Sequence, residues 1–138
     1  MSAVLADTHA AVWALYDPAR LSPPARASLT AASQSGKLYI SAITLVEVNY
    51  LAGKKSFPYP GAFAQLLALA ADPNEALEVL PVTADVARAM DRVPRAEVPD
   101  MPDRIVAATA VAHQLPLVSA DSDIRGSAGV NALVSVIW

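Results

Sequence analysis

Residues 5–15 read LADTHAAVWAL, and the aspartate at position 7 stands where an apolar segment gives way to a segment with helical spacing. Residues 3–6 are predicted to form a buried strand. Thr8 is predicted to cap a helix that runs to about Tyr16, where an Asp-Pro pair ends it. A strand followed at once by a helix is the first half of a βαβ unit, so this stretch predicts an α/β fold. It also places the Asp7 carboxylate directly after the first strand.

The alternation of apolar and Ala- or Leu-rich helical segments continues along the chain. Further strands are predicted at residues 38–40, 77–80, 116–119 and 133–137. Helices are predicted between them, after Thr83 and at about residues 22–36, 41–51, 61–71 and 102–113. The strands read as continuous apolar runs, which is typical of strands buried on both faces. We therefore expect a parallel sheet that is covered by helices on each side.

Length and composition narrow the class of protein. The 138 residues are about the size of one ordinary domain, so we expect residues 1–138 to form a single domain. The chain has no cysteine, which excludes disulfides, thiolate zinc sites and thiol nucleophiles, and any bound metal must be held mainly by oxygen. It has neither a basic leader with a long apolar region nor a run of about 18 apolar residues, so we expect a cytoplasmic protein without membrane contact.

Acidic residues recur where predicted strands or connections end, and these are Asp7, Glu47 in SAITLVEV, Asp103 in MPDRIVAATA and Asp121 in LVSADSD. In parallel α/β sheets, ligands bind beyond the carboxyl ends of the strands. A helical projection places Glu47 among Ile43, Tyr50 and Leu51, on the face expected to be buried. A carboxylate buried without a partner costs several kcal/mol, so Glu47 needs a cation or a proton.

Four carboxylates at one edge would repel one another. Two like charges about 4 Å apart repel by roughly 1 kcal/mol in water and about 4 kcal/mol at an effective dielectric constant of about 20. A divalent cation removes this repulsion, and oxygen ligands without Cys or paired His select Mg²⁺ or Mn²⁺ over zinc. Such an ion acidifies water and neutralises charge on a phosphate during in-line displacement. The pattern therefore favours phosphodiester hydrolysis, although the spacing does not name the substrate.

Each acid taken alone also has an ordinary structural explanation. Asp7 and Asp103 are favourable charges at helix N-termini, and Asp121 suits a turn. Glu47 is a surface residue if the assumed helix phase is wrong. The metal-site hypothesis therefore depends on the four acids occurring together in this order.

The ordered segments DTHAAVWAL, ISAITLVEV, MPDRIVAATA and LVSAD resemble the PIN-domain ribonucleases, specifically the VapC-type toxins of bacterial toxin-antitoxin systems. RLSPPAR after the first helix also fits, and the resemblance spans almost the whole chain. It implies a single PIN-like nuclease domain over residues 1–138. It also implies a three-layer α/β/α fold with a five-stranded parallel sheet in the order 3-2-1-4-5.

The same resemblance implies roles for the acids. Asp7, Glu47, Asp103 and Asp121 would be a catalytic quartet that holds one or two Mg²⁺ ions, with Asp7 and Asp103 as the best candidates for direct ligands. Asp123 would be an outer-sphere residue. The family cuts RNA endonucleolytically, usually forms dimers, and is inhibited by a cognate antitoxin that occupies a groove near the active site.

The basic residues offer candidate contacts to RNA. The net charge of −3 does not indicate a nucleic-acid binder, but much of the acidity belongs to the quartet. Candidate phosphate contacts are Lys54, Lys55, Arg88, Arg92 and Arg95, and a solvated surface is the commoner explanation for such charges. Arg104 points about 100° away from Asp103, so a salt bridge or a partner contact is preferred over phosphate binding.

Other polar residues near the acids have mainly structural interpretations. The Thr8 hydroxyl would face the metal site, but the residue is expected to be a helix cap. His9 lies one turn before Trp13, where stacking is easy. Phe57 and Tyr59 in FPYP form a partner surface, a platform for RNA bases, or a loop packed on its own domain.

Two other classes of function compete with the nuclease. A phosphoaspartyl or receiver-like domain also has an aspartate after its first strand. The phosphatase form needs a second aspartate where this chain has His9, and the receiver form needs a lysine after a late strand, which is absent. A PIN-fold binding module without catalysis is the other alternative. Retention of all four acids argues against it, because without metal their repulsion brings no benefit.

Overall fold

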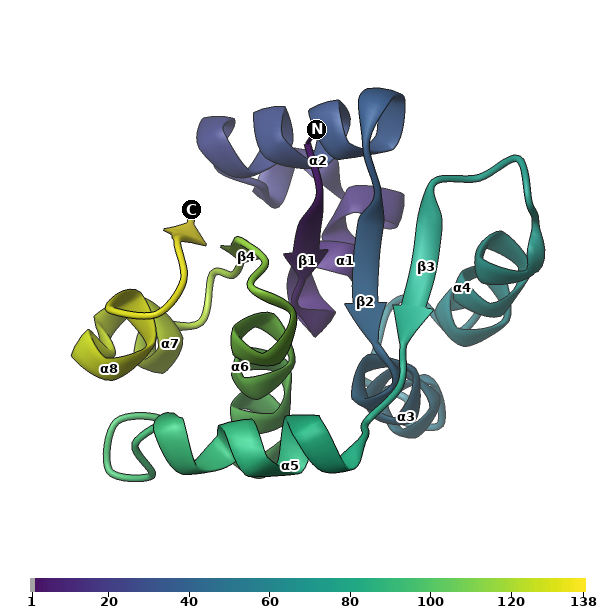
Figure 1. The fold of residues 1–138 in the computed structure, drawn as a ribbon. Coiled ribbons are helices and arrows are strands. Elements are labelled where there is room, and N and C mark those ends of the chain that lie inside the picture. The colour runs from purple at the N-terminus through teal and green to yellow at the C-terminus, as the bar shows by residue number, and fades with distance from the viewer. Residues whose placement is uncertain (1) are drawn as a thin grey trace.

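A computed structural model describes residues 2–138 and contains one five-stranded parallel sheet (Figure 1). The strand order β3-β2-β1-β4-β5 confirms the expected order. The strands are β1 (Val4–Ala6), β2 (Leu38–Ser41), β3 (Leu77–Leu80), β4 (Leu117–Val118) and β5 (Val136–Ile137). Because all neighbouring strands are parallel, their carboxyl ends lie along one edge of the sheet.

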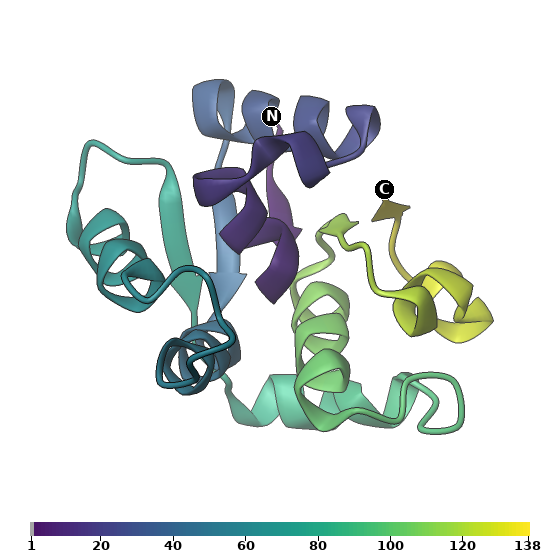
Figure 2. The same ribbon diagram turned by 180° about the vertical axis from the view of Figure 1, so that it is seen from behind.

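Helices cover both faces of the sheet. They are α1 (Thr8–Tyr16), α2 (Pro23–Ser35), α3 (Ala42–Ala52), α4 (Ala62–Ala71), α5 (Ala84–Ala89), α6 (Met101–His113), α7 (Ser122–Gly126) and α8 (Ala128–Asn131), with 3-10 turns η1 (Pro18–Arg20) and η2 (Met90–Arg92). In the view from behind, α1 passes in front of β1, with α2 across its upper end (Figure 2). None of the helices in residues 2–138 is both long and apolar enough to cross a membrane.

The side chains of β1 divide the core into two clusters. Val4 and Ala6 pack with buried residues of α1, α2 and α4, whereas Leu5 packs with those of α5, α6, α7 and α8. This alternation follows from the period of two along a strand. The central strand is therefore buried on both faces, and the three-layer α/β/α architecture expected from the sequence is confirmed.

The ends of some elements differ from the predictions. Asp7, and not Thr8, is the N-cap of α1, because its Oδ1 accepts a hydrogen bond from the backbone N–H of Ala10 at 2.8 Å. The fifth strand begins at Val136, because the backbone N–H groups of Leu133 and Val134 bond to a carbonyl of the preceding turn. Residues 122–131, for which no helix or strand was predicted, contain the short helices α7 and α8.

Candidate active site

Asp7 lies at the end of the central strand β1 and is 6% exposed. Its Oδ1 caps α1, and its Oδ2 accepts a hydrogen bond from the Ser119 hydroxyl. Burial raises the pKa of the Asp7 carboxyl above its usual value, and the nearby Asp121 adds to this rise. The hydrogen bonds from Ser119 and Ala10 and the neighbouring His9 oppose it. Asp7 is thus a buried, oriented carboxylate whose charged form gains from a nearby cation.

Ser119 is a site residue that the sequence analysis does not identify. It follows β4, is fully buried, and donates to Asp7 while its Oγ accepts the backbone N–H of Asp121 at 3.1 Å. One hydroxyl therefore connects two of the predicted acids. A serine two residues before an aspartate at the end of a strand is a common turn-forming pattern, so LVSAD contains the relevant signal.

Glu47 is held by two threonine hydroxyls between α1 and α3. The Thr8 hydroxyl donates to Glu47 Oε1 at 2.6 Å, and Thr8 Oγ1 lies 3.1 Å from Thr44 Oγ1. Both threonines are buried, and Glu47 is half-buried. The predicted helix phase is partly wrong, because Tyr50 is 66% exposed and the buried positions of α3 are Thr44 and Val48. Glu47 therefore lies at the border of the buried face, next to a donor.

Asp103 lies in the first turn of α6, and Asp100 caps this helix by accepting the Asp103 backbone N–H at 3.3 Å. Partial burial raises the pKa of the Asp103 carboxyl to about 7. The charges of Asp121, Asp100, Glu47 and Asp7 act in the same direction. All three other members of the predicted quartet are therefore close enough to Asp103 to disfavour its ionisation.

Asp121 caps α7, where its Oδ2 accepts the backbone N–H of Ile124 at 3.0 Å. Its side chain is half-buried, whereas Asp123 in the same first turn is exposed. Asp121 acts electrostatically on both Asp7 and Asp103. It is thus the member of the quartet that links the end of β1 to the start of α6.

The four carboxylates share an edge without forming a closed ligand set. In residues 2–138, no three acidic or histidine side chains are arranged to hold an ion as they stand. The donor set nevertheless suits a hard divalent cation, because it consists of carboxylate oxygens with hydroxyl groups behind them. Their mutual repulsion is the physical property that such a cation would relieve.

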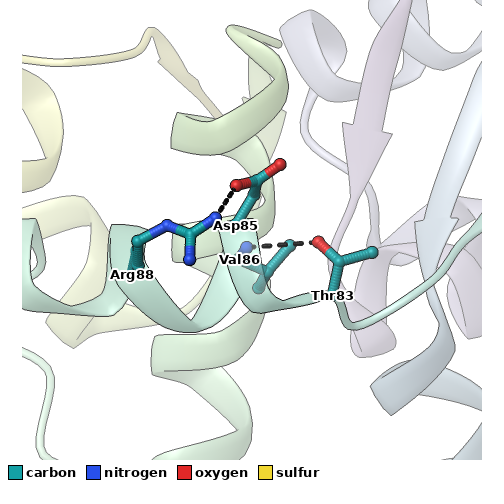
Figure 3. A network of polar contacts seen from close by, with 4 residues as sticks. All are labelled: Thr83, Asp85, Val86 and Arg88. Atoms are coloured by element: carbon teal, nitrogen blue, oxygen red, sulfur yellow. Dashed lines mark hydrogen bonds and ion pairs between the residues drawn. The ribbon is translucent and has the colours of Figure 1, made fainter.

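The candidate phosphate contacts Lys54, Lys55, Arg88 and Arg92 are exposed. Figure 3 shows Arg88 paired with Asp85 on α5, and Thr83 capping that helix through the backbone N–H of Val86 at 3.3 Å. The Arg88 and Asp85 side chains are both mostly exposed. Because exposed pairs contribute little and are easily exchanged, Arg88 remains available to another anion.

Two further cations are engaged within the chain. Lys54 Nζ lies 4.6 Å from the centroid of the exposed Tyr50 ring. Arg104 donates through Nη2 to the carbonyl oxygens of Met90 and Val93, at 2.7 and 3.0 Å. Its partners here are backbone carbonyls, so of the two roles predicted for Arg104 the salt bridge is wrong and the partner contact stays a prediction. The guanidinium instead ties the segment after α5 to α6.

The aromatic residues mostly pack on their own domain. His9 stacks against Trp13 with 5.6 Å between ring centroids, as predicted. Tyr59 stacks on Tyr16 at 4.9 Å, and Phe57 packs edge-on against Tyr59. Among the three interpretations of FPYP, packing on the same domain is therefore the one that these contacts match.

The sequence profile of the PIN domain matches residues 4–129, which include all four acids. The chain belongs to the PIN-domain family. Ribonuclease VapC22 from Mycobacterium tuberculosis is 30% identical to this PIN domain over 129 residues, covering 91% of this chain and 92% of the relative. The resemblance to VapC-type ribonucleases is thus confirmed, and the receiver-like alternative loses its support.

Solved structures share the PIN fold along its whole length. One of them is a chain from the crystal structure of Rickettsia felis VapBC2 bound to a DNA fragment of the VapBC2 promoter. It superposes with a TM-score of 0.68 at 16% identity, and the match covers 99% of both chains. A chain of DNA-bound VapBC from Salmonella typhimurium has a TM-score of 0.68 at 20% identity, covering 99% of this chain and 97% of that one. At these identities the likeness concerns the fold alone.

Proposed function

We propose that the protein is an endoribonuclease that uses Mg²⁺ or Mn²⁺ to hydrolyse RNA phosphodiester bonds. The observation that carries this proposal is the gathering of Asp7, Glu47, Asp103 and Asp121 from four separate elements, at β1, α3, α6 and α7. Partial burial and the charges of neighbouring acids raise the pKa of the Asp103 carboxyl to about 7 in this setting. Such a concentration of negative charge favours a divalent cation. Family membership and the similarity to a protein named ribonuclease VapC22 support RNA as the substrate.

Within this proposal each acid has a role. Asp7 and Asp103 are direct metal ligands, Glu47 and Asp121 complete the quartet, and Asp123 acts from the outer sphere. When bound, a divalent ion would supply a more acidic water and charge neutralisation at the phosphate.

The hydroxyl groups of the chain serve these acids. Thr8 holds the Glu47 carboxylate, and Ser119 holds Asp7 while it also accepts the backbone N–H of Asp121. These hydrogen bonds keep the carboxylate oxygens oriented before substrate arrives.

The RNA strand would approach over exposed cations of the chain. We propose Lys54, Lys55, Arg88 and Arg92 as contacts, because all four are exposed. Arg104 is left out, since its Nη2 is already occupied by two carbonyl oxygens. Phosphate contacts of this kind make binding weaken as the salt concentration rises.

We further propose that the protein is the toxin of a toxin-antitoxin pair, acts in the cytoplasm as a homodimer, and is inhibited by a cognate antitoxin. Solved chains that share its fold come from structures described as VapBC of Rickettsia felis and Salmonella typhimurium. An adjacent open reading frame for a small protein, and a complex of the two on co-purification, are the expected results. Light scattering of the isolated chain tests the dimer.

The deciding experiment is cleavage of total RNA and transfer RNA by antitoxin-free protein, with Mg²⁺, Mn²⁺ or a chelator. Asp7→Asn, purified in the same way, controls for contaminating nuclease. We expect discrete fragments that require metal and disappear in the variant. Cleavage that persists in the variant would contradict the proposal. RNA binding without cleavage by the wild-type protein would favour the binding module.

A further inference from the structure

The carboxylate of Glu97 joins two segments that are far apart in the sequence. Its Oε1 accepts hydrogen bonds from the Ser127 hydroxyl at 2.6 Å and from the Gly129 backbone N–H at 3.0 Å. These bonds hold the pKa of the Glu97 carboxyl below its usual value. The connection between η2 and α6 lies beside α7 and α8 in both ribbon views (Figures 1 and 2). We call this set of contacts, made by Glu97, Ser127 and Gly129, the Glu97 clasp.

On one side of the Glu97 clasp, the connection before α6 is fixed to that helix. Val93 and Val98 are buried in the core, and Arg104 of α6 bonds to the carbonyl oxygen of Val93. The backbone N–H groups of Glu97 and Val98 both donate to the Pro94 carbonyl. This side therefore moves as one body with the first turn of α6, which carries Asp103.

On the other side, α7 and α8 form a second small unit. The side-chain amide of Asn131 donates to the carbonyl oxygens of Arg125 at 3.2 Å and Ser127 at 2.8 Å, which ties the two helices together. Asp121 caps α7. The Glu97 clasp therefore joins the unit that carries Asp121 to the unit that carries Asp103.

The fit at the Glu97 clasp is close. A Cβ atom added at Gly129 would lie 2.7 Å from Cδ and Cγ of Pro94, so the two segments approach at a distance that only glycine permits. Ser127 is almost completely buried, and its hydroxyl both donates to Glu97 and accepts the backbone N–H of Val130 at 3.1 Å. Removing Glu97 would leave that buried hydroxyl and the Gly129 N–H without their acceptor.

We propose that Glu97 is a positioning residue, and that its clasp sets where Asp121 lies relative to Asp103. The inference rests on the proposed function only where it concerns catalysis. Asp121 caps α7 and Asp103 lies in the first turn of α6, so the position of α7 relative to α6 governs how the two carboxylates share a cation.

The test compares the full-length wild-type protein with Glu97→Ala, Glu97→Gln and Gly129→Ala. Glu97→Gln keeps an acceptor oxygen, and Gly129→Ala separates the segments while the carboxylate is retained. Glu78→Ala is the matched control, because Glu78 is exposed on β3 and accepts no side-chain hydrogen bond in the described part of the chain. Three quantities are measured: Mn²⁺ affinity by titration calorimetry, kcat and KM for RNA, and hydrogen exchange of the amides of residues 121–131.

We expect Glu97→Ala and Gly129→Ala to lower Mn²⁺ affinity and kcat by about 10-fold each, with KM within about 2-fold of wild type. Amide exchange across α7 and α8 should become faster in both variants, Glu97→Gln should recover most of each loss, and Glu78→Ala should match the wild type. A general loss of folded protein would also lower the apparent kcat at unchanged KM, but in the Mn²⁺ titration it would reduce the number of sites per chain and not their affinity. The Mn²⁺ affinity and the number of sites therefore separate positioning from a loss of folded protein.

Wild-type amide exchange in folded Glu97→Ala would overturn the Glu97 clasp itself. Faster exchange with unchanged Mn²⁺ affinity and kcat would overturn its role in positioning. Failure of the proposed function would look different, because the wild-type protein would then neither bind Mn²⁺ nor cleave RNA. That result overturns the catalytic role of Glu97, while amide exchange still decides whether the clasp holds α7 and α8.

Discussion

The two halves of the acidic edge are held in different ways. Asp7 and Glu47 accept hydrogen bonds from the hydroxyls of Ser119 and Thr8, which are almost completely buried. Asp103 and Asp121 lie at the N-termini of α6 and α7 and are half-buried. The first pair is fixed by donors in the core, whereas the second pair lies at the first turns of two helices and depends on the balance of charge between neighbouring acids. The difference teaches that buried hydroxyl groups hold one pair of acids, whereas the N-termini of helices hold the other.

Asp7→Asn should have the largest effect, because it removes the charge of the most tightly held carboxylate. We expect kcat to fall by more than about 100-fold. Replacing a residue that merely holds a metal ligand in place already lowers metal affinity or activity by about 10- to 100-fold. The amide oxygen can still cap α1, and loss of a buried charge should raise the unfolding free energy by roughly 1 kcal/mol. RNA cleavage and thermal unfolding without metal measure the two effects. A variant that is both inactive and less stable would mean that Asp7 mainly supports the fold.

Ser119→Ala tests the donor behind Asp7. We expect the unfolding free energy to fall by roughly 1–3 kcal/mol, because Asp7 Oδ2 and the Asp121 N–H lose a buried partner. The value of kcat should fall by about 10-fold. Denaturant unfolding and RNA cleavage are the measurements, with Ser33→Ala as the control, since the exposed Ser33 hydroxyl bonds only to the Leu29 carbonyl. Equal losses in both variants would show that the effect is not specific to the site.

Thr8→Val and Thr8→Ser form a matched pair on the Glu47 side. Valine has no donor for Glu47 Oε1, whereas serine keeps the hydroxyl. We expect Thr8→Val to lose roughly 1 kcal/mol of unfolding free energy and a few-fold in kcat, with Thr8→Ser close to the wild type. Loss of activity in Thr8→Ser as well would point to the methyl group and to packing between α1 and α3.

Asp103 should make the stability of the wild-type protein depend on pH. Its pKa is raised from 3.8 to about 7, so between these values the folded protein keeps a proton that the unfolded chain has released. The free energy of unfolding should therefore fall as the pH rises through this window. Thermal unfolding measured in a chelator between pH 5 and 8 should show a smaller fall in the free energy of unfolding for Asp103→Asn than for the wild-type protein. Added Mg²⁺ should stabilise the wild-type protein more at about pH 8 than at pH 5.5, because protons and the cation compete for the same oxygens.

The order of elements was predictable because the strands are apolar runs bounded by capping residues such as Ser22, Ser41 and Thr83, all of which cap helices in the structure. The positions of the acids followed from the rule for carboxyl ends of parallel strands. Helices α7 and α8 were missed because they have only 5 and 4 residues, too few for helical periodicity to show.

The partners of the acids could not be predicted in the same way. Thr44 and Ser119 act through contacts between elements, and the sequence distance from Ser119 to Asp7 is 112 residues. The exposure of Tyr50 depends on which side of α3 faces the sheet, and the helix is apolar on most sides, so periodicity gave no clear phase. Local patterns thus locate the carboxylates, while the groups that orient them depend on tertiary packing.

The pairing of β1 with β4 has a consequence for synthesis. β1 is made before the other strands, yet the backbone N–H of Leu5 donates to the Pro116 carbonyl, which directly precedes β4. Asp121, the acid after β4, is also made late. At about 5–20 residues per second, the ribosome makes all the residues between β1 and β4 before the central strand gains its second neighbour. Under the proposed function, a growing chain therefore carries no assembled nuclease. The topology itself delays activity until β4 and Asp121 have been made.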